Sequence, residues 1–317
     1  MKKLKLTKRE NKAYFYLLPW IIGILLLQLY PFLTSFYYSF TDYNALSPES
    51  TFLGLKNYIQ LFTRDNEFRQ SLAATIKYAI FTVPCKILMS LFIAMLLNKG
   101  RKGIGILRTI YYLPSLFGGS IAVAILWKVM FMDDGMVNAL LNSVGIDTIS
   151  FFGDPKTALP TLSSLEVWQF GSSMVMFLAA LKQVPVSLYE AAEIDGANHF
   201  KIFSSIVIPL GKPILVTMGL FSGLAYWNDW TNGLYYLSGN DGQKLYGIQN
   251  LLNQMITDIQ YLASGKVTGN IGAEVAKLPA TSIRMAIAFI AMLPLFIIYP
   301  FLQKYFSEGI TLGAVKG

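Results

Sequence analysis

The sequence contains a single cysteine, Cys85, and a single histidine, His199, among its 317 residues. One cysteine allows no intramolecular disulfide, and one histidine allows no histidine cluster for a metal ion. A membrane enzyme would need a nucleophile with its base or a set of metal ligands, and these residues supply neither. The phosphate-binding pattern G-x-x-x-x-G-K-[ST] is also missing from the sequence. We therefore expect a protein that is not an enzyme, with no catalytic residue, metal or cofactor of its own.

Charge is scarce as well. Charged residues make up 14% of the chain and hydrophobic residues 54%, with a mean hydropathy of +0.48. Because soluble domains carry about 25% charged residues, this composition indicates a polytopic membrane protein. The net charge of +8 fits basic residues in cytoplasmic loops beside anionic lipid. Nucleic-acid binding is not expected, because the basic residues do not cluster on an aromatic-rich soluble module.

Six stretches are long and apolar enough to cross a bilayer, which takes about 20 residues per helix. They lie near residues 14–40, 72–98, 108–131, 159–181, 213–238 and 281–303. The fold class is therefore all-α, with six transmembrane helices in a single transmembrane domain over residues 14–317, after a basic tail over 1–13. No pair of broken half-helices in matching positions is evident, and such a pair is a mark of secondary transporters.

The basic residues predict the orientation of these helices, because Lys and Arg concentrate on the cytoplasmic side. Two segments stand out, the N-terminal tail and the connection between the second and third helices. Their basic residues are Lys2, Lys3, Lys5, Lys8, Arg9, Lys12, Lys99, Arg101, Lys102 and Arg108. An even number of helices then returns the C-terminus to the cytoplasm, together with the polar segment 187–210.

Segment 187–210 has the features of two short helices joined by a tight turn. Ser187 and Glu190 fit a capping box, which places the first helix from residue 188. Gly196 suits a left-handed helix end, and Asn198 suits the cap of the second helix. The common alternative is an amphipathic helix lying on lipid headgroups. The segment carries more acidic than basic residues, however, which favours insertion into a groove of a partner protein.

The same segment resembles the EAA loop of permease subunits of ATP-binding cassette (ABC) importers. The resemblance consists of Glu190-Ala191-Ala192, then Gly196 after three residues, and Ile208-Pro209 further on, with Ile208 where the family prefers Leu. In that family the loop is a coupling helix that sits in a cleft of the ATP-hydrolysing subunit. The residues that the resemblance assigns to coupling are Glu190, Ala191, Ala192, Asp195, Gly196, Ala197 and Phe200.

The resemblance covers nearly the whole chain, which is similar to the permeases of carbohydrate importers of the maltose and glycerol-phosphate type. YPFLTSFYYSFTDYN at 30–44 resembles the first permease of such pairs, whereas YWNDW at 226–230 and the tail 299–317 resemble the second. The family implies an oligosaccharide importer in the bacterial plasma membrane, in contact with lipid. It also implies a second permease, an external sugar-binding protein, and an ATPase dimer that binds ATP and Mg.

Sugars pack on aromatic faces and hydrogen-bond to polar groups, and the fourth and fifth helices offer both kinds of residue. An interfacial aromatic belt is the open alternative for the aromatic residues. Lys86 lies near the bilayer centre. Its side chain either faces the substrate path, opposite Glu166 or Asp229, or pairs with a carboxylate and only fixes helix packing. The candidate path residues are Trp168, Gln169, Trp227, Asn228, Asp229, Lys86 and Glu166. A secondary transporter or channel for a small polar solute is the alternative function.

Overall fold

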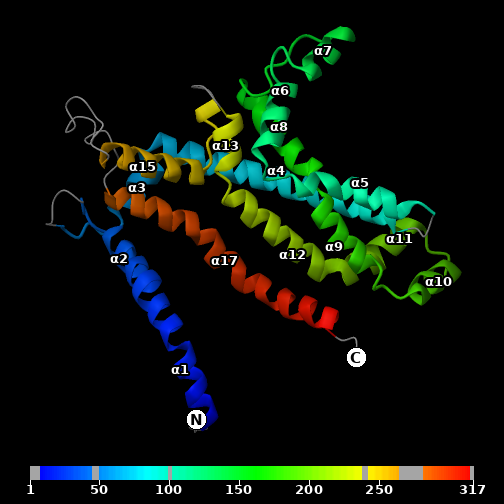
Figure 1. Ribbon diagram of the computed structural model, residues 1–317, viewed down its shortest axis with the longest axis horizontal. Coiled ribbons are helices and arrows are strands. Elements are labelled where there is room, and N and C mark those ends of the chain that lie inside the picture. Colours follow the sequence, from blue (N-terminus) through cyan, green and yellow to red (C-terminus); the bar gives the residue numbers. More distant parts are fainter. Residues whose placement is uncertain (1–7, 45–49, 99–101, 238–241, 264–280, 315–317) are drawn as a thin grey trace. The chain divides into compact units, whose positions relative to one another are not determined.

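The computed structural model describes residues 8–44, 50–98, 102–237, 242–263 and 281–314 (Figure 1). Its regular elements are helices, and an isolated antiparallel bridge joins Thr41 and Phe52. The α-helices are α1 (Lys8–Gly23), α2 (Tyr30–Tyr38), α3 (Lys56–Thr63), α4 (Asn66–Leu97), α5 (Ile104–Leu116), α6 (Ile121–Met130), α7 (Met136–Ser143), α8 (Pro155–Trp168), α9 (Gly171–Leu181), α10 (Val186–Ile194), α11 (His199–Ile202), α12 (Ile208–Trp227), α13 (Thr231–Tyr236), α15 (Ile248–Ala263) and α17 (Thr281–Ala314). Two π-helical turns, η1 (Ile24–Leu29) and η2 (Phe203–Val207), continue directly into α2 and α12.

The all-α membrane architecture predicted from composition is confirmed. Four continuous helical stretches are long and apolar enough to cross a membrane: Phe15–Tyr38, Asn66–Leu97, His199–Trp227 and Thr281–Pro300. Two bent helix pairs, α5 with α6 and α8 with α9, bring the number of candidate spans to six if each pair forms one span. The basic residues Lys2, Lys3, Lys5, Lys99 and Arg101, on which part of the predicted orientation depends, lie outside the described residues.

The sequence shows no pair of broken half-helices in matching positions, yet two of the predicted membrane-spanning helices are broken in the structure. The axis turns by 96° between α5 and α6 and by 50° between α8 and α9. Gly118 and Gly119 lie in the first break, shortly after Pro114, and glycine and proline are the usual causes of sharp kinks. At the second break the helical hydrogen bonding stops around Gln169 and resumes at Gly171.

The fifth predicted helix also ends earlier than its sequence suggests. We expected an apolar helix over 213–238, but α12 stops at Trp227 and α13 follows as a separate short helix. The side chain of Asn228 donates to the carbonyl of Leu224 at 2.9 Å, and Asp229 accepts from the backbone N–H of Asn232 at 3.1 Å. Such side-chain bonds to nearby backbone compete with a continuing helix. Asn228 and Asp229 therefore lie at a helix end and not inside a helix.

The chain forms two compact units, and α15 and α17 contribute to both. The first unit comprises residues up to 65 and residues 255–291. Its buried Asn57 donates to the carbonyls of Ser39 at 2.8 Å and Thr41 at 2.7 Å, which fixes the backbone after α2. Phe289 of α17 packs against Phe36 of α2, with ring centroids 4.8 Å apart. Whether residues 14–317 act as a single transmembrane domain stays a prediction.

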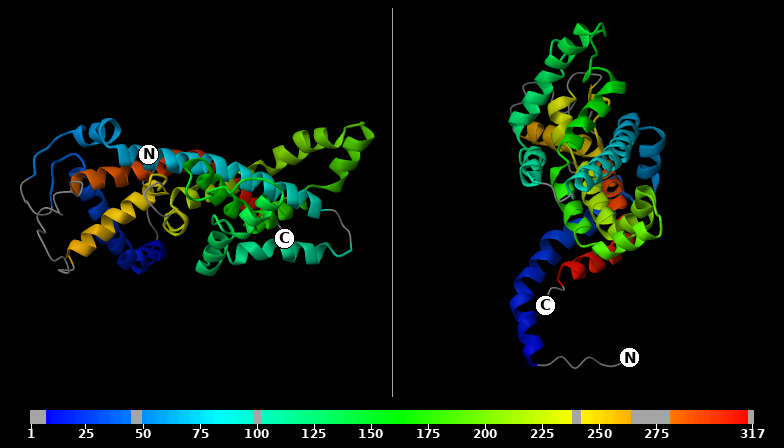
Figure 2. Two further views of the ribbon diagram at one scale, coloured as in Figure 1. Left: turned by 90° about the horizontal axis from the view of Figure 1, so that it is seen from above. Right: turned by 90° about the vertical axis from the view of Figure 1, so that its right-hand side faces the viewer.

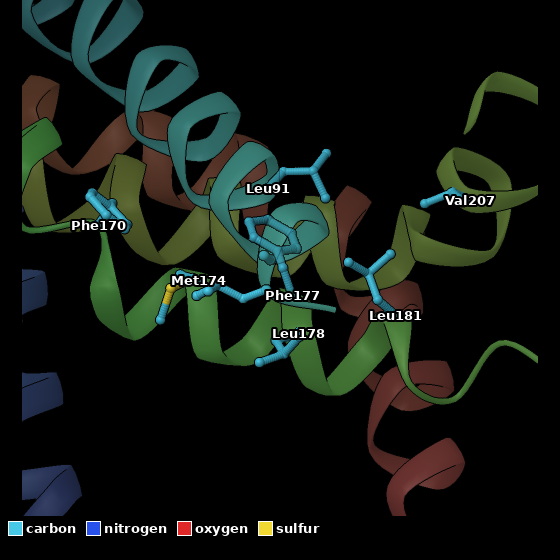
Figure 3. Close-up of a cluster of buried hydrophobic side chains, with 9 residues drawn as sticks. Leu91, Phe170, Met174, Phe177, Leu178, Leu181 and Val207 are labelled. Carbon is cyan, nitrogen blue, oxygen red and sulfur yellow. The ribbon is translucent and has the colours of Figure 1, made fainter. Parts of the chain in front are cut away.

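The second unit is built around α4, which packs against α8, α9 and α12. Leu91 of α4, Phe177 and Leu181 of α9 and Val207 of η2 are buried together in an apolar core (Figure 3). The hydroxyl of Ser90 on α4 donates to the carbonyl of Lys86 at 2.6 Å and lies 3.2 Å from the carbonyl of Phe170. That carbonyl accepts the first helical hydrogen bond of α9, from the N–H of Met174 at 2.9 Å. In lipid every backbone polar group needs such a partner within the protein.

Gly171 allows the closest backbone approach in this core. A Cβ atom at position 171 would lie 2.7 Å from the carbonyl oxygen of Tyr111 and 2.7 Å from the Cα of Tyr112, both on α5. These atoms belong to backbone and cannot rotate away. The absence of a side chain at this position is therefore what lets α5 and α9 pack together.

We predict that Gly171→Ala lowers the thermal unfolding temperature of the purified protein, because α5 must move away from α9. Overpacking of this kind costs about 1–3 kcal/mol. Gly105→Ala is the matched control on α5, since nothing lies within 4 Å of its Cβ position. Equal unfolding temperatures for the two variants would show that the α5–α9 contact does not limit stability.

Candidate functional site

A cavity of about 370 Å³ lies in the second unit where three helix ends meet. The break between α5 and α6 contributes Gly118, Gly119 and Ser120, and the C-terminal part of α8 contributes Glu166. The end of α12 and the start of α13 supply the rest of the wall, including Tyr226. Its size falls at the lower end of the usual range for small-molecule sites, about 300–1,000 Å³.

A network of charged and polar side chains holds this cavity together. The ammonium of Lys86 lies 3.6 Å from a carboxylate oxygen of Glu166, and both side chains are largely buried. The amide of Asn232 donates to Glu166 at 2.9 Å and to Asp229 at 2.8 Å. The Lys86 ammonium also lies 5.3 Å from the centre of the Tyr226 ring, within the range of a cation–π contact. The network joins α4, α8, α12 and α13.

Four of the predicted path residues come together here. Glu166, Asn228 and Asp229 line the cavity, and Lys86 lies behind its wall in the pair with Glu166. Of the two partners considered for Lys86, the structure shows the ion pair with Glu166. That pair fits both interpretations of Lys86, a role in the substrate path and a role in helix packing. Glu166 fixes Lys86 to α8 and is at the same time part of the cavity wall.

Trp168, Trp227 and Gln169 are not among the residues that line the cavity. Trp168 packs against Trp127 of α6, with ring centroids 5.6 Å apart, and remains 41% exposed. Trp227 is partly buried near the end of α12. Gln169 is buried directly against Gly118, so that any side chain at position 118 would collide with its amide. Gln169 thus supports the break that forms the cavity.

The third predicted helix and α13 contribute to the cavity in a way that the sequence did not reveal. Gly118, Gly119 and Ser120 were read as part of a continuous apolar span, although a glycine pair shortly after a proline is a signal for a break. Tyr236 lines the cavity and is fully buried. Its hydroxyl has no hydrogen-bond partner in the part of the chain that the structure describes.

A second candidate site is the loop formed by α10 and α11, which lies at one end of the second unit in Figures 1 and 2. The left-handed conformation predicted for Gly196 is confirmed, with φ at +72°. The N–H of Ala197 donates to the carbonyl of Ala192 at 2.9 Å, which closes the end of α10. Asn198 caps α11 as predicted, since its side chain accepts from the N–H of Lys201 at 2.8 Å.

The predicted capping box at Ser187 is wrong. Helix α10 begins at Val186, two residues earlier than the box requires, and Pro185 is its N-cap residue without a side-chain bond. Pro185 has a non-helical ψ of 133°, and Ser187 already lies inside the helix. The Glu190 side chain is exposed.

The outer surface of the loop carries large apolar side chains as well as acidic ones. Glu190, Ala191, Asp195 and Gly196 are exposed, and Ala192 and Ala197 are partly buried. Large apolar side chains stand beside them, with Ile194 86% exposed and Phe200 77% exposed. Of these two, sequence reasoning had singled out only Phe200.

The opposite side of the loop is anchored to the helix bundle. Tyr189 and Phe203 pack against the apolar core that includes Leu91, Phe177 and Val207. Burial of Tyr189 raises the pKa of its phenol above the ordinary value. One side of the loop is thus held by α4 and α9 while the other presents apolar side chains outward.

Several apolar spans, two of them broken around a polar cavity, together with an exposed helical loop define the chain as a membrane transport component. The family of binding-protein-dependent transport system inner membrane components matches residues 63–312, and the chain belongs to this family. Because these transport systems depend on a binding protein, membership decides against the alternative of a self-sufficient secondary transporter or channel.

Two relatives and one solved structure illustrate the similarity. The probable ABC transporter permease protein YesP of Bacillus subtilis is 42% identical over 249 residues, covering 78% of this chain and 80% of YesP. The trehalose/maltose transport system permease protein MalF of Thermococcus litoralis is 33% identical over 215 residues, covering 67% of this chain and 72% of MalF. A chain in the crystal structure of a bacterial alginate ABC transporter with its pentasaccharide-bound periplasmic protein has the same fold, with a TM-score of 0.68, 21% identity and 93% of each chain covered. The resemblance of the two halves to different permeases stays a prediction.

We predict that Lys86→Met destabilises the protein, because it leaves the largely buried Glu166 carboxylate without its cation. Removing one partner of a buried ion pair costs about 3–5 kcal/mol. The double variant Lys86→Met/Glu166→Gln should recover most of this loss, since no unpaired charge remains. Thermal unfolding of the purified variants measures both effects.

Lys77→Met on the same helix is the control, because Lys77 is exposed. If Lys86→Met and Lys77→Met unfold at the same temperature, the pair with Glu166 does not stabilise the fold. If the double variant is no more stable than Lys86→Met, the loss does not come from an uncompensated carboxylate.

Proposed function

We propose that this chain is one of two permease subunits of an ATP-driven importer of oligosaccharides in a bacterial plasma membrane. The cavity at the broken helices carries the proposal. Aromatic residues in its wall, such as Tyr226 and Trp230, offer faces for the C–H surfaces of a sugar. Carboxylates, amides and hydroxyls stand beside them for the sugar hydroxyls. The name of the MalF relative, a trehalose/maltose transport system permease, supports a carbohydrate as the transported substrate.

The proposal assigns the loop of α10 and α11 to coupling with a dimeric ATPase, which binds ATP and Mg. Exposed large apolar side chains such as Ile194 and Phe200 are suited to a protein partner. Tyr189 and Phe203 connect the loop to the core between α4 and α9. Movement of the ATPase pair can then reach the helices of the path through a packed contact.

The remaining parts of the proposal concern orientation and the outer partner. Basic residues near the N-terminus and between α4 and α5 favour a cytoplasmic location for both termini and for the coupling loop. The opposite face then receives a soluble sugar-binding protein, in line with the family's dependence on one. A second permease completes the path, and lipid surrounds the apolar outer faces of the helices.

We predict that the importer purified through this chain takes up oligosaccharides into proteoliposomes only when ATP and the binding protein are both supplied. The cavity alone cannot drive accumulation, because the sequence contains no phosphate-binding loop. The measurement is uptake of a panel of labelled neutral and acidic oligosaccharides. Full-rate uptake without ATP, or without the binding protein, would contradict the proposal, as would failure to take up any member of the panel.

We predict that Gly196→Arg abolishes ATP-driven uptake while membrane insertion is retained. A side chain in the left-handed conformation costs roughly 1 kcal/mol or more, and arginine here would project from the surface proposed for the ATPase. Gly103→Arg is a matched control, because Gly103 also has a positive φ, of +89°, with open space around it, at the other connection predicted to be cytoplasmic.

Uptake is measured beside co-purification of the ATPase for both variants. Loss of uptake in Gly196→Arg alone supports coupling through this loop. Equal loss in both variants would attribute the defect to backbone strain, and normal uptake in Gly196→Arg would remove the loop from the mechanism.

A further inference from the structure

The hydrogen-bonding groups of the cavity wall are unevenly divided between donors and acceptors. Its wall contains two carboxylates, those of Glu166 and Asp229, and an ionised carboxylate is an acceptor only. Among the described residues that line the cavity none is basic. A ligand in this cavity therefore meets acceptors with full negative charge but no full positive charge.

The amide donors in the wall are already engaged. Both described bonds of the Asn232 amide nitrogen go to the two carboxylates, at 2.9 Å and 2.8 Å. The amide nitrogen of Asn228 donates to the carbonyl of Leu224, and its oxygen accepts from Gln249 at 3.1 Å. An amide has two N–H groups, and those of Asn232 are used to hold the carboxylates in place. The side-chain donors left for a ligand are mainly neutral hydroxyl and indole groups, and none of them carries a positive charge to offset that of an anion.

The nearby cations are held behind the wall. Lys86 pairs with Glu166 and faces the Tyr226 ring. The ammonium of Lys128 donates to the backbone carbonyl of Tyr235 at 3.1 Å. To reach a ligand carboxylate, Lys86 would have to leave Glu166 as an unpaired charge in a largely buried place, which is unfavourable.

Two tyrosines of the wall suit a hydroxyl-bearing ligand. Tyr226 and Tyr236 are buried, and neither hydroxyl has a hydrogen-bond partner among the described residues. Buried polar groups are normally satisfied, so a partner from outside the chain is expected. A hydroxyl group of a ligand can donate to a tyrosine oxygen or accept from it, and other hydroxyls of the same ligand can donate to Glu166 and Asp229.

We propose that the cavity selects uncharged, hydroxyl-rich oligosaccharides and discriminates against uronic-acid oligosaccharides of the same shape. This inference rests on the proposed function and names the substrate class of the same site. Sugar hydroxyls donate to the carboxylates of Glu166 and Asp229, whereas a uronate would place a third carboxylate beside them. Like charges at such short range repel even when they are partly solvated.

The test uses pairs of trisaccharides that differ only at C6, a uronate and its carboxyl-reduced counterpart, in the gluco, manno and galacto series. Affinities are measured by titration calorimetry with the purified importer in the absence of the binding protein, which could impose a selection of its own. In the pair that binds most tightly, we expect the neutral trisaccharide to bind about tenfold more tightly than the uronate. A difference of this size corresponds to one unfavourable charge contact.

Asp229→Asn keeps the shape of the wall and removes one of its two negative charges, so the preference for the neutral trisaccharide should fall from about tenfold to about threefold. Asp133→Asn, an exposed carboxylate that is not part of the cavity wall, is the control and should leave the preference unchanged. If Asp229→Asn does not assemble, the double variant Lys86→Met/Glu166→Gln serves the same purpose, because it also removes one wall carboxylate and leaves no unpaired charge behind the wall.

The outcomes separate the two proposals. A uronate that binds as tightly as its neutral counterpart, or more tightly, overturns the charge selection and leaves carbohydrate transport standing. An unchanged preference in both wall variants also overturns it, since the carboxylates would then not be its source. If no oligosaccharide of the panel binds or is taken up by the complete system, the proposed function itself falls.

Discussion

The ion pair between Lys86 and Glu166 connects the middle of α4 to the last turn of α8, just before the break that precedes α9. Charges in a membrane span are unfavourable unless they are paired, so each residue needs the other to stay in place. Asn232 extends the pair to Asp229 and thereby holds α13 beside α8. The polar cavity exists because these helix ends are kept together by charge in otherwise apolar surroundings.

Much of the fold could be read from the sequence, because long apolar stretches report burial in lipid directly. The breaks at Gly118 and Gln169 were not anticipated, since hydropathy averages over such short interruptions. Local backbone chemistry was predicted unevenly. Gly196 and Asn198 behave as expected because a left-handed turn and an Asx cap depend on few residues. Ser187 does not, because the neighbouring Pro185 determines where α10 begins.

The cavity shows why site residues are harder to predict than spans. Glu166, Asn228 and Asp229 were found because polar residues in apolar stretches are conspicuous. Trp168 was chosen as an aromatic face for a sugar, but its ring packs against Trp127 outside the cavity wall. Tyr236 was passed over because its place in the wall depends on α13 turning back towards α8, which arises from tertiary contacts such as that between Asn232 and Glu166.

The close packing of α4 on the start of α9 restricts what evolution can do at position 90. Ser90 is fully buried, and its hydroxyl lies 3.2 Å from the backbone carbonyl of Phe170. A larger side chain at position 90 would meet that backbone, so the position needs a small residue. A change of volume on the outer side of α4 can be absorbed by lipid, whereas a larger residue at position 90 would require α9 to move. Position 90 is thus expected to stay small among related permeases.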